Sequence, residues 1–376
     1  MFPQRGDSTE MRVMILSNFD LGLYQFRKEL IQELLKDNEV FISLPYGKLI
    51  EPLKKMGCKF IDTPLDRRGI NPIADLMLLN KYHRMLKREK PDLVITYTIK
   101  PNIYGGIACR IAGTPYAVNI TGLGTAFQND GILRKIVTRM YKESCKKAKV
   151  VFFENVENRQ IFIDLQLVKE SQACLLNGAG VNLEYYHVMD YPEDIDEIRF
   201  LFIGRVMKEK GVDELFIAMK KLVDERMHCS LDIVGPYEED YRETIKQYEN
   251  EGWLRYRGYQ KDVRAFIKNC HCFVLPSWHE GMANTNLECA ASGRPVITSN
   301  IHGCLEAVLD GKTGYLVEKK NADELYRAMK KFAELSYETR KLMGIAGRRH
   351  MEETFDKREV VKATLDALVR GYQDND

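Results

Sequence analysis

The chain has no long hydrophobic run, no paired-cysteine motif and no leader-like start. No apolar stretch approaches the roughly 20 residues that a membrane-spanning helix needs. The first ten residues, MFPQRGDSTE, lack the apolar segment of a secretory signal, so we leave them out of the fold and take Met11 as its natural start. We therefore expect neither a membrane-spanning protein nor a secreted one.

The cysteines do not have the spacing of a disulfide framework. Nine cysteines with no even spacing and no CxxC pair are typical of reduced, mostly buried thiols in a cytosolic protein. The closest pair, Cys270 and Cys272, flanks His271 in an apolar strand, which favours a place in the core over a metal site. No DxD motif follows a strand, because Asp194 and Asp196 fall in an acidic linker, so we expect no catalytic metal and no cofactor.

Composition and charge indicate a globular protein with an anionic partner. The 376 residues, 45% hydrophobic and 29% charged, suit two domains and exclude collagen, disordered tails and small disulfide scaffolds. The net charge of +2 conceals an asymmetry, since residues 1–180 contain 27 Lys and Arg against 19 Asp and Glu, and residues 181–376 contain 29 against 35. A basic first half suggests nucleic acid, phospholipid or a diphosphate as partner.

Short apolar strands alternate with helical stretches in two series, which is typical of parallel sheets with crossover helices. The first series is Arg12–Ser17, Val40–Leu44, Leu93–Thr96, Ala117–Ile120, Val150–Glu154 and Ala173–Leu176. The second is Arg199–Ile203, Ser230–Val234, Leu254–Tyr256, Cys272–Leu275, Val296–Thr298 and Tyr315–Val317. A helical stripe of apolar residues from Leu23 to Leu35 predicts a helix that Asp20 caps.

The organisation predicted is an α/β fold of two Rossmann-like domains facing each other across a cleft. The acidic, proline-containing stretch Asp190–Glu197 (DYPEDIDE) is the expected linker, so the domains would comprise residues 11–190 and 191–354. Helices are expected between the later strands and at the end of the chain, at Val212–Glu225, Glu239–Glu249, Asp262–Lys268, Asn284–Ala291, Ala322–Leu335 and Phe355–Tyr372.

Unusual residues gather where strands of the second domain end, the edge at which open α/β sheets bind ligands. Four successive strand ends carry Gly204-Arg205, Gly235-Pro236, Gly258-Tyr259 and Ser277–Gly281. Arg205 and Lys210 fit a diphosphate clamp, because a guanidinium offers a fork of donors and an ammonium a mobile charge. For this pair alone, an ordinary charged turn is an equally good interpretation.

The segment EGMANTNLE is the stronger indication. Glu280 lies in a loop directly after a strand, where a carboxylate can accept hydrogen bonds from sugar hydroxyls. Glu288 lies one turn into a helix that Asn284 or Thr285 begins, where it can hold the two hydroxyls of a ribose. The amides of Gly281, Met282, Ala283 and Asn284 would face phosphates. A structural capping role for Glu288 is the alternative.

With these motifs the second domain resembles the retaining glycosyltransferases of family 4, which have the GT-B fold. The matching stretches are Phe202–Arg205, Glu209–Gly211, Gly258-Tyr259, PSWHEGMANTNLECAASGRPVITSNIHGCLEAV and DGKTGYLVE. The resemblance implies that Arg205 and Lys210 hold the donor diphosphate, that Glu280 contacts the donor sugar and that Glu288 binds the ribose. It also implies that the final helix, 355–372, returns to the first domain.

The first domain carries the resemblance less clearly. Its first strand runs into Ser17–Gly22, where the family places a glycine-bearing loop under the nucleotide, which implies a donor contact for Gly22. TYTIKPNIYGGIACR and NITGLGTAF look like a subgroup that extends polyprenyl-diphosphate-linked sugars in bacterial surface glycans or glycoproteins. Lys100, Asn102 and Thr121 are candidate acceptor-side residues. Thr121 stands where many relatives have a histidine, so no histidine contact to the donor sugar is implied.

The basic stretch Arg134–Lys149 interleaves seven cations with apolar residues. A soluble helix with one solvated face is the simpler interpretation of this stretch alone. The lipid-acceptor resemblance and the basic first half favour peripheral contact with an anionic membrane, at the cytoplasmic face of the inner membrane. Nucleic acid is disfavoured, because no aromatic residues are interleaved with this charge as stacking platforms.

The resemblance implies transfer of a hexose or N-acetylhexosamine from a UDP-sugar to a polyprenyl-diphosphate-linked sugar acceptor, with retention of configuration. Arg205, Lys210 and a helix dipole would stabilise charge on the leaving phosphate, which takes the acceptor's proton, so no protein base is assigned. Two alternatives are open: a sugar-nucleotide epimerase of the same fold and a non-catalytic sugar-nucleotide-binding subunit.

Overall fold

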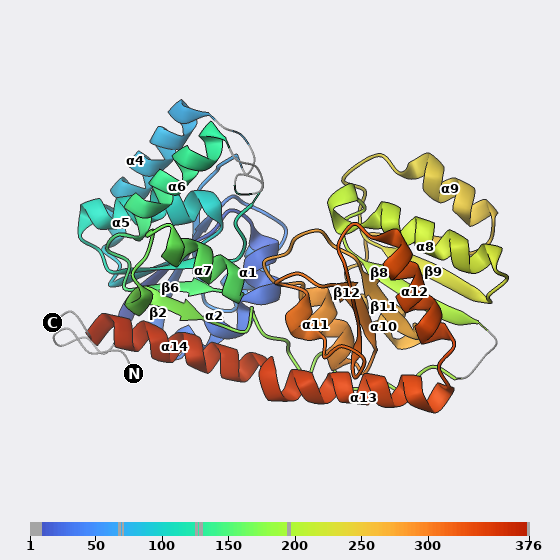
Figure 1. Cartoon of the computed structure of the whole chain (residues 1–376). Coiled ribbons are helices and arrows are strands. Elements are labelled where there is room, and N and C mark those ends of the chain that lie inside the picture. Colours follow the sequence, from blue (N-terminus) through green and yellow to red (C-terminus); the bar gives the residue numbers. More distant parts are fainter. Residues whose placement is uncertain are drawn as a thin grey trace. The chain divides into compact units, whose positions relative to one another are not determined.

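The computed structural model describes residues 10–66, 69, 71–124, 127, 131–193 and 197–373 (Figure 1). The chain divides into two compact units. The first comprises the chain up to Ala179 together with the residues from Arg358 onward, and the second is Gly180–Lys357. The division after Ala179 lies about ten residues before the expected boundary at 190, and Asp194–Asp196 of the expected linker lie outside the described residues.

The first unit is built on a seven-stranded parallel sheet of order β3-β2-β1-β4-β5-β6-β7. Its inner strands are almost wholly buried, because helices cover both faces. β3 was not predicted from the sequence. The bounds are β1 Met11–Leu16, β2 Asn38–Leu44, β3 Lys59–Asp62, β4 Leu93–Tyr97, β5 Tyr116–Ile120, β6 Val150–Phe153 and β7 Ala173–Leu175.

Helices follow every strand of this sheet except β7, after which the described chain continues to β8. They are α1 Asp20–Phe26, α2 Lys28–Leu34, α3 Ile50–Lys55, α4 Pro72–Glu89, the π-helical turn η1 Pro101–Gly105, α5 Gly106–Ala112, α6 Ile132–Cys145, α7 Val156–Asp164 and the 3-10 turn η3 Glu170–Gln172. The single helix predicted over Leu23–Leu35 is two, because the chain breaks at Arg27. The Arg27 guanidinium pairs with Glu154 at the end of β6 and lies 4.9 Å from the centre of the Tyr97 ring.

The second unit contains a six-stranded parallel sheet of order β10-β9-β8-β11-β12-β13. The strands are β8 Ile198–Ile203, β9 Cys229–Val234, β10 Leu254–Gly258, β11 Cys272–Leu275, β12 Val296–Ser299 and β13 Gly314–Val317. The helices are η4 Lys208–Lys210, α8 Val212–Asp224, α9 Arg242–Asn250, α10 Arg264–Asn269, α11 Asn284–Ala291, η5 Leu305–Ala307, α12 Ala322–Ala333 and α13 Tyr337–Thr354. The predicted fold class, two Rossmann-like α/β domains, is confirmed.

The last helix, α14 (Lys357–Gln373), belongs to the first unit from Arg358 onward. Val361, Ala367 and Leu368 are buried in one cluster with residues of β1 and α2, such as Val13 and Leu30. The helix begins two residues later than predicted, because Phe355 and Asp356 separate it from α13.

The structure shows the state of the cysteines and how long and apolar the helices are. All nine cysteines are free, and eight of them are buried. Cys270, His271 and Cys272 lie in the core, where burial lowers the pKa of His271 to about 4 and its Nδ1 accepts a hydrogen bond from the Arg199 amide at 3.0 Å. Within the described ranges, no helix is long and apolar enough to cross a membrane.

Candidate functional site

Two glycine backbones meet at the carboxyl edge of the second sheet. Gly204 follows β8 and Gly235 follows β9, the neighbouring strand. A Cβ on Gly235 would lie 1.9 Å from the Gly204 carbonyl oxygen, and Gly235 has φ +146°, so no other residue fits there without moving the backbone. The two strand ends therefore form a floor that lacks side chains.

Lys210 is held beside this floor by a tight turn. The turn η4 ends at Gly211, whose φ of +73° starts α8 and whose Cα packs against the Pro276 carbonyl after β11. The Trp278 amide donates to the Glu209 carbonyl at 2.9 Å, which fastens the same two loops together. Lys210 is thus fixed relative to the loop that carries Glu280, although the two residues are 70 positions apart.

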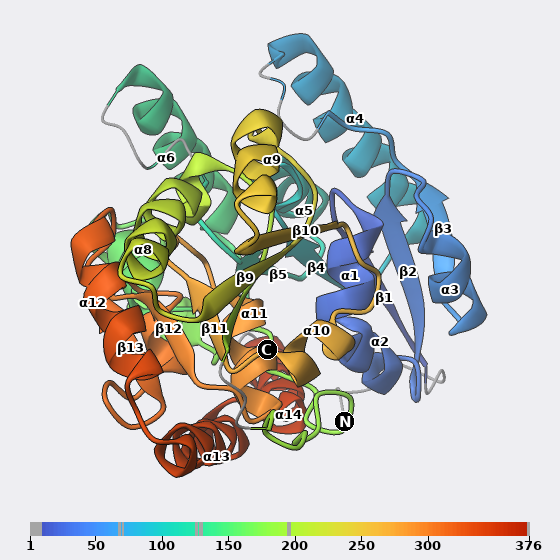
Figure 2. The same ribbon diagram turned by 90° about the vertical axis from the view of Figure 1, so that its right-hand side faces the viewer.

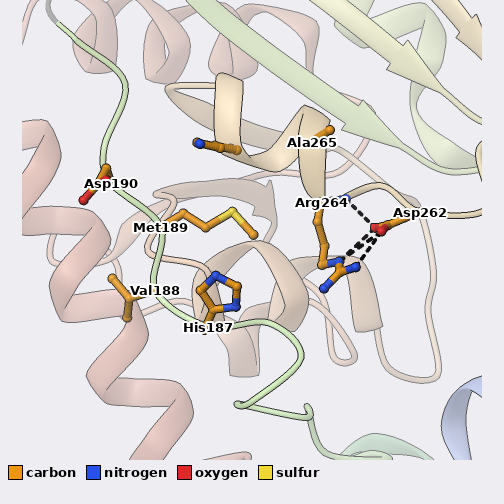
Figure 3. A pocket seen from close by; sticks show the side chains of 8 residues that line it. His187, Val188, Met189, Asp190, Asp262, Arg264 and Ala265 are labelled. Carbon is orange, nitrogen blue, oxygen red and sulfur yellow. Dashed lines mark hydrogen bonds and ion pairs between the residues drawn. The ribbon is translucent and has the colours of Figure 1, made fainter.

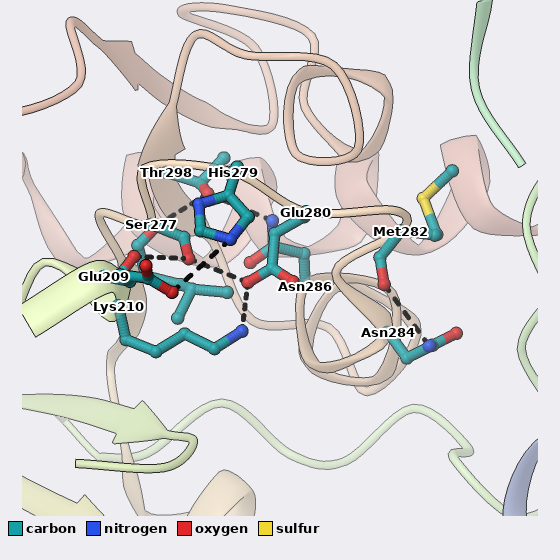
Figure 4. Close-up of polar contacts among 10 residues, drawn as sticks. Glu209, Lys210, Ser277, His279, Glu280, Met282, Asn284, Asn286 and Thr298 are labelled. Carbon is teal, nitrogen blue, oxygen red and sulfur yellow. Dashed lines mark hydrogen bonds and ion pairs between the residues drawn. The ribbon is translucent and has the colours of Figure 1, made fainter. Parts of the chain in front are cut away.

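The Lys210 ammonium and the Glu280 carboxylate form an ion pair at the centre of the site (Figure 4). Their side chains are only 19% and 13% exposed, and the Ser277 hydroxyl donates to the same Glu280 oxygen at 2.8 Å. On the outer side of the turn, His279 lies 3.5 Å from Glu209. The arrangement brings together a cation and a carboxylate that are both partly desolvated, which strengthens their interaction with a bound anion or hydroxyl.

The loop after Glu280 leads into the first turn of α11. Met282 and Ala283 are buried, and the Ala283 amide is bonded to the Gly303 carbonyl at 2.7 Å. The helix begins at Asn284, as predicted, and its N-cap, Ala283, has no capping side chain. The Oδ1 atoms of Asn284 and Asn286 are buried and have no hydrogen-bond partner among the described residues. This helix start therefore presents polar groups that its own chain does not satisfy.

Glu288 lies on α11, one turn beyond Asn284. Burial raises the pKa of Glu288 to about 7, and the hydrogen bond from Tyr186 and the charge of Lys357 oppose the shift only in part. The carboxyl group therefore changes its charge near neutral pH. The predicted structural alternative, a helix cap, does not apply, since Glu288 lies in the middle of α11 (Asn284–Ala291).

Arg205 does not join this cluster. Its side chain is 46% exposed, and its guanidinium lies 3.5 Å from Glu238 in the segment after β9. Tyr259, after β10, is also exposed. Both residues lie at the carboxyl edge of the sheet, as predicted from the strand ends, but among the charged residues predicted for the donor the ion pair joins Lys210 to Glu280 and not to Arg205.

A separate pocket of about 360 Å³ lies beside α10 in the second unit (Figure 3). His187, Asp190, Arg264 and Lys268 are among its lining residues. Arg264 is already bound by both oxygens of Asp262 and lies 4.0 Å from the centre of the Tyr185 ring. None of the predicted site residues lines this pocket, and its arginine is already paired.

In the first unit the predicted site residues lie in different local environments. Gly22 lies inside α1 and not in a loop, and Asp20 is the first residue of that helix rather than its cap, with its Oδ2 accepting from the Leu49 amide at 2.7 Å. Lys100 pairs with Asp75 at 2.8 Å and lines a groove of about 990 Å³ beside α4. Thr121 directly follows β5 at the carboxyl edge and is half-buried.

Asn102 is structural. It is 1% exposed, its Oδ1 accepts from Thr96 at 2.8 Å, and its Nδ2 donates to the Asn119 carbonyl at 2.7 Å. Both polar ends of the side chain are therefore used between β4 and β5, and none is left to face a ligand. The expectation that Asn102 faces an acceptor is not supported by this geometry.

Sequence reasoning missed Ser277 and Tyr186, which hold the two predicted glutamates. Ser277 stands three residues before Glu280, in the stretch PSWHEG, so its proximity along the chain was visible in the sequence. Tyr186 lies about one hundred residues before Glu288, and nothing in the sequence relates the two.

Comparison with known proteins agrees with this architecture. Residues 12–155 match the model of the Glycosyl transferase 4-like family, and residues 190–350 match that of Glycosyl transferases group 1. The chain is 28% identical over 333 residues to the N,N'-diacetylbacillosaminyl-diphospho-undecaprenol alpha-1,3-N-acetylgalactosaminyltransferase of Campylobacter jejuni, covering 84% of this chain and 87% of that protein. It is 28% identical over 282 residues to the Escherichia coli UDP-Gal:alpha-D-GlcNAc-diphosphoundecaprenol alpha-1,3-galactosyltransferase, covering 70% and 71%.

Solved structures match along nearly the whole chain. A glycosyltransferase from Rickettsia africae has a TM-score of 0.81 at 18% identity, covering 98% of this chain and all of that one. Anabaena HepE in complex with UDP and glucose has a TM-score of 0.78 at 15% identity, covering 96% and 99%. The fold is that of the GT-B enzymes, and the two family models together match most of the chain, one in each unit: the chain is a glycosyltransferase built of a Glycosyl transferase 4-like domain followed by a Glycosyl transferases group 1 domain.

Proposed function

We propose that this glycosyltransferase transfers a hexose or N-acetylhexosamine from a UDP-sugar to a polyprenyl-diphosphate-linked sugar, with retention of configuration, in the assembly of a bacterial surface glycan. The relatives from Campylobacter jejuni and Escherichia coli both act on undecaprenol-diphosphate-linked sugars. The observation that supports binding of the UDP-sugar donor is the Lys210–Glu280 pair beside the Gly204–Gly235 floor. This pair offers a cation at a place where a diphosphate can approach the backbone closely.

The donor diphosphate is assigned to Lys210 and Arg205. Departure of the nucleoside diphosphate leaves negative charge on the phosphate, and fixed cations aimed at that charge stabilise the transition state most. Lys210 is preorganised by Glu280. Arg205, exposed and 3.5 Å from Glu238, has to reorient onto the phosphates, as a flexible side chain with a weak surface pair can do. The start of α11 adds its dipole to the same side.

Glu280 is assigned to the donor sugar and Glu288 to the ribose. Lys210 and Ser277 both donate to Oε1 of Glu280, so its second oxygen, Oε2, can accept from a sugar hydroxyl. An ionised Glu288 can accept from both ribose hydroxyls. The acceptor's proton passes to the leaving phosphate, so no protein base and no metal ion are given a role.

Product analysis separates the three possible activities. The protein is incubated with UDP-sugars, with and without an undecaprenyl-diphosphate-linked acceptor sugar. Release of UDP only when the acceptor is present supports the proposal. An isomerised donor sugar supports the epimerase, and donor binding without turnover supports the non-catalytic subunit; either result contradicts the proposal.

We propose in addition that the first unit contacts the membrane through the tips of α4 and α6. Both helices begin after the carboxyl ends of strands in the same parallel sheet, and both views draw them projecting at the same end of the unit (Figure 1 and Figure 2). Their first turns expose apolar side chains, each between 42% and 78% exposed: Ile73, Leu76 and Met77 on α4, and Ile132, Leu133 and Ile136 on α6. Lys81 and Arg84 follow on α4, and Lys135 and Arg139 on α6.

This membrane surface differs from the one expected over Arg134–Lys149. The helix ends at Cys145, so Lys146, Lys147 and Lys149 lie past its end, beside the amino end of β6. Because α6 runs from one edge of the sheet to the other, these lysines lie at the edge opposite the apolar tips. An anionic cytoplasmic leaflet would attract the cations near the tips while the apolar side chains enter the headgroup region.

Vesicle sedimentation tests the membrane surface. With vesicles of anionic phospholipid, the pair of changes Leu76→Glu and Ile136→Glu should weaken binding by at least about tenfold, because two exposed apolar contacts are lost. Ile111→Glu is the matched control, since Ile111 is 60% exposed but lies at the end of α5, on the opposite edge. An equal loss of vesicle binding in the double variant and in the Ile111→Glu control would contradict the proposal.

A further inference from the structure

A groove of about 1080 Å³ opens at the amino edge of the first sheet. Its walls come from the loops that lead into β5, β6 and β7, three neighbouring strands, and from the last turns of α14. In a parallel sheet this edge lies opposite the carboxyl edge, at which α/β sheets bind their substrates. None of the residues that we assign to the donor or to the tips of α4 and α6 lines the groove.

The charged side chains that line this groove all have the same sign. Glu143, on α6, accepts from Arg110 at 2.8 Å and offsets the charge of that one guanidinium. Glu170 stands between two lining residues, yet it pairs with Arg159 at 3.4 Å. No aspartate or glutamate belongs to the lining in the part of the chain that the structure describes, whereas six cationic residues do: Arg110, Lys146, Lys147, Lys149, Lys169 and Arg370.

Five of these cations, all except Arg110, have no carboxylate partner among the described residues. Exposed lysines elsewhere in the first unit do pair with an acid one turn away, as Lys36 does with Glu33 at 2.7 Å and Lys54 with Glu51 at 2.9 Å. Like charges gathered in a cleft repel one another, and the cleft focuses their field and concentrates ions of opposite charge. A bound anion would therefore relieve the repulsion between the five cations.

Hydrogen bonds and close packing hold the backbone of the lysine-bearing loop in place. The Lys149 amide donates to the Tyr116 carbonyl at 2.9 Å, and the Gln172 side chain donates to the Ala148 carbonyl at 2.7 Å. α14 packs directly on the same loop, since a Cβ on Gly371 would lie 3.1 Å from the Lys149 carbonyl oxygen. Because the floor is fixed, only the cationic side chains have to be ordered when an anion binds.

We propose that this groove binds a soluble small molecule that carries two or three phosphate groups. Near pH 7 a phosphate group carries about −1.5 to −2 charges, so two or three of them match five unpaired cations. The volume is at the upper end of the range for small-molecule sites, roughly 300–1,000 Å³. Tyr116 is the one aromatic residue of the lining and is 1% exposed, so a nucleobase finds no face on which to stack. A bilayer surface is flat and does not reach the floor of a concave groove.

The thiol of Cys174 measures occupancy of the groove directly. Cys174 lines the groove and is the one cysteine of the nine that is not buried. Its reaction with N-ethylmaleimide is followed by mass spectrometry while tripolyphosphate is titrated into the wild-type chain. We expect the reaction to slow at least about fivefold as the groove fills, because a covered thiol is not attacked. Orthophosphate should need at least about a tenfold higher concentration for half-protection, because one group meets fewer of the cations.

Two double variants test whether the cations of the groove are responsible. Lys146→Gln with Lys169→Gln removes two of them, from different walls. Lys55→Gln with Lys87→Gln is the matched control, since both are exposed lysines of the first unit that do not line the groove. The tripolyphosphate concentration for half-protection of Cys174 should rise at least about fivefold in the first double variant and stay within about twofold in the control.

Three results would overturn the proposal. The first is an absence of protection in the wild-type chain, and the second is an equal shift in the two double variants. The third is protection of Cys174 by phosphatidylglycerol vesicles at the same phosphate concentration as tripolyphosphate, which would assign the groove to a lipid headgroup. No readout depends on turnover, so the outcome is independent of the proposed transfer reaction.

Discussion

The affinity for the UDP-sugar donor should depend on pH through Glu288. Burial raises the pKa of this carboxyl to about 7, and the proposed ribose contact needs the ionised form. At pH 6 about one carboxyl in eleven is ionised, and at pH 8 about ten in eleven. The dissociation constant should therefore be about tenfold larger at pH 6 than at pH 8, and most of the change should fall around pH 7.

Calorimetric titration with UDP-N-acetylglucosamine measures this dependence. UDP itself is avoided, because its terminal phosphate titrates near pH 6. Glu288→Gln keeps the size of the side chain but removes its titration, so its affinity should be flat with pH and close to that of the wild type at pH 6. A wild-type affinity that does not change between pH 6 and 8, or an equal slope in Glu288→Gln, would refute the assignment of Glu288 to the ribose.

The remaining predictions concern catalysis, stability and metal dependence. Lys210→Ala should lower kcat at least about 100-fold, whereas Lys208→Ala, an exposed neighbour on the same turn, should stay within about threefold; similar losses in both would remove the diphosphate assignment. Gly235→Ala should cost at least about 3 kcal/mol in unfolding free energy because its Cβ meets backbone, whereas Gly252→Ala, also at positive φ but with open space around it, should cost about 1 kcal/mol. Thermal melts compare the two, and equal shifts would contradict the clash. Turnover should survive dialysis against EDTA, and a loss restored by Mg²⁺ would assign a metal to the reaction. Because its pKa is raised, Glu288 stabilises the fold below about pH 4.5 and loses that contribution as the pH rises through 7, so Glu288→Gln should gain stability relative to the wild type over that range in urea titrations.

The alternation of apolar strands and helices was enough to predict both sheets. Buried parallel strands read as continuous Val, Ile, Leu and Phe, and twelve such runs coincide with strands of the structure. β3 escaped because KFID is short and only half-buried, so it lacks that pattern. The grouping of Lys210 with Glu280 was also predictable, because the carboxyl ends of neighbouring parallel strands meet at one edge.

What the sequence did not contain are contacts between distant residues. Leu23–Leu35 has the periodicity of one helix, yet the chain breaks at Arg27, whose guanidinium pairs with Glu154, 127 positions away. Asn102 looks like a loop residue after a strand, yet Thr96 and Asn119 bury it.

The return of α14 makes the first unit discontinuous and leaves the second unit as an insertion within it. During synthesis the second unit, Gly180–Lys357, is complete before the residues that finish the first have been made. Val361, Ala367 and Leu368 are then the last buried side chains to reach the β1 sheet. The half of the chain that emerges first from the ribosome is thus the half that must wait, with part of its core uncovered, until α14 has been made.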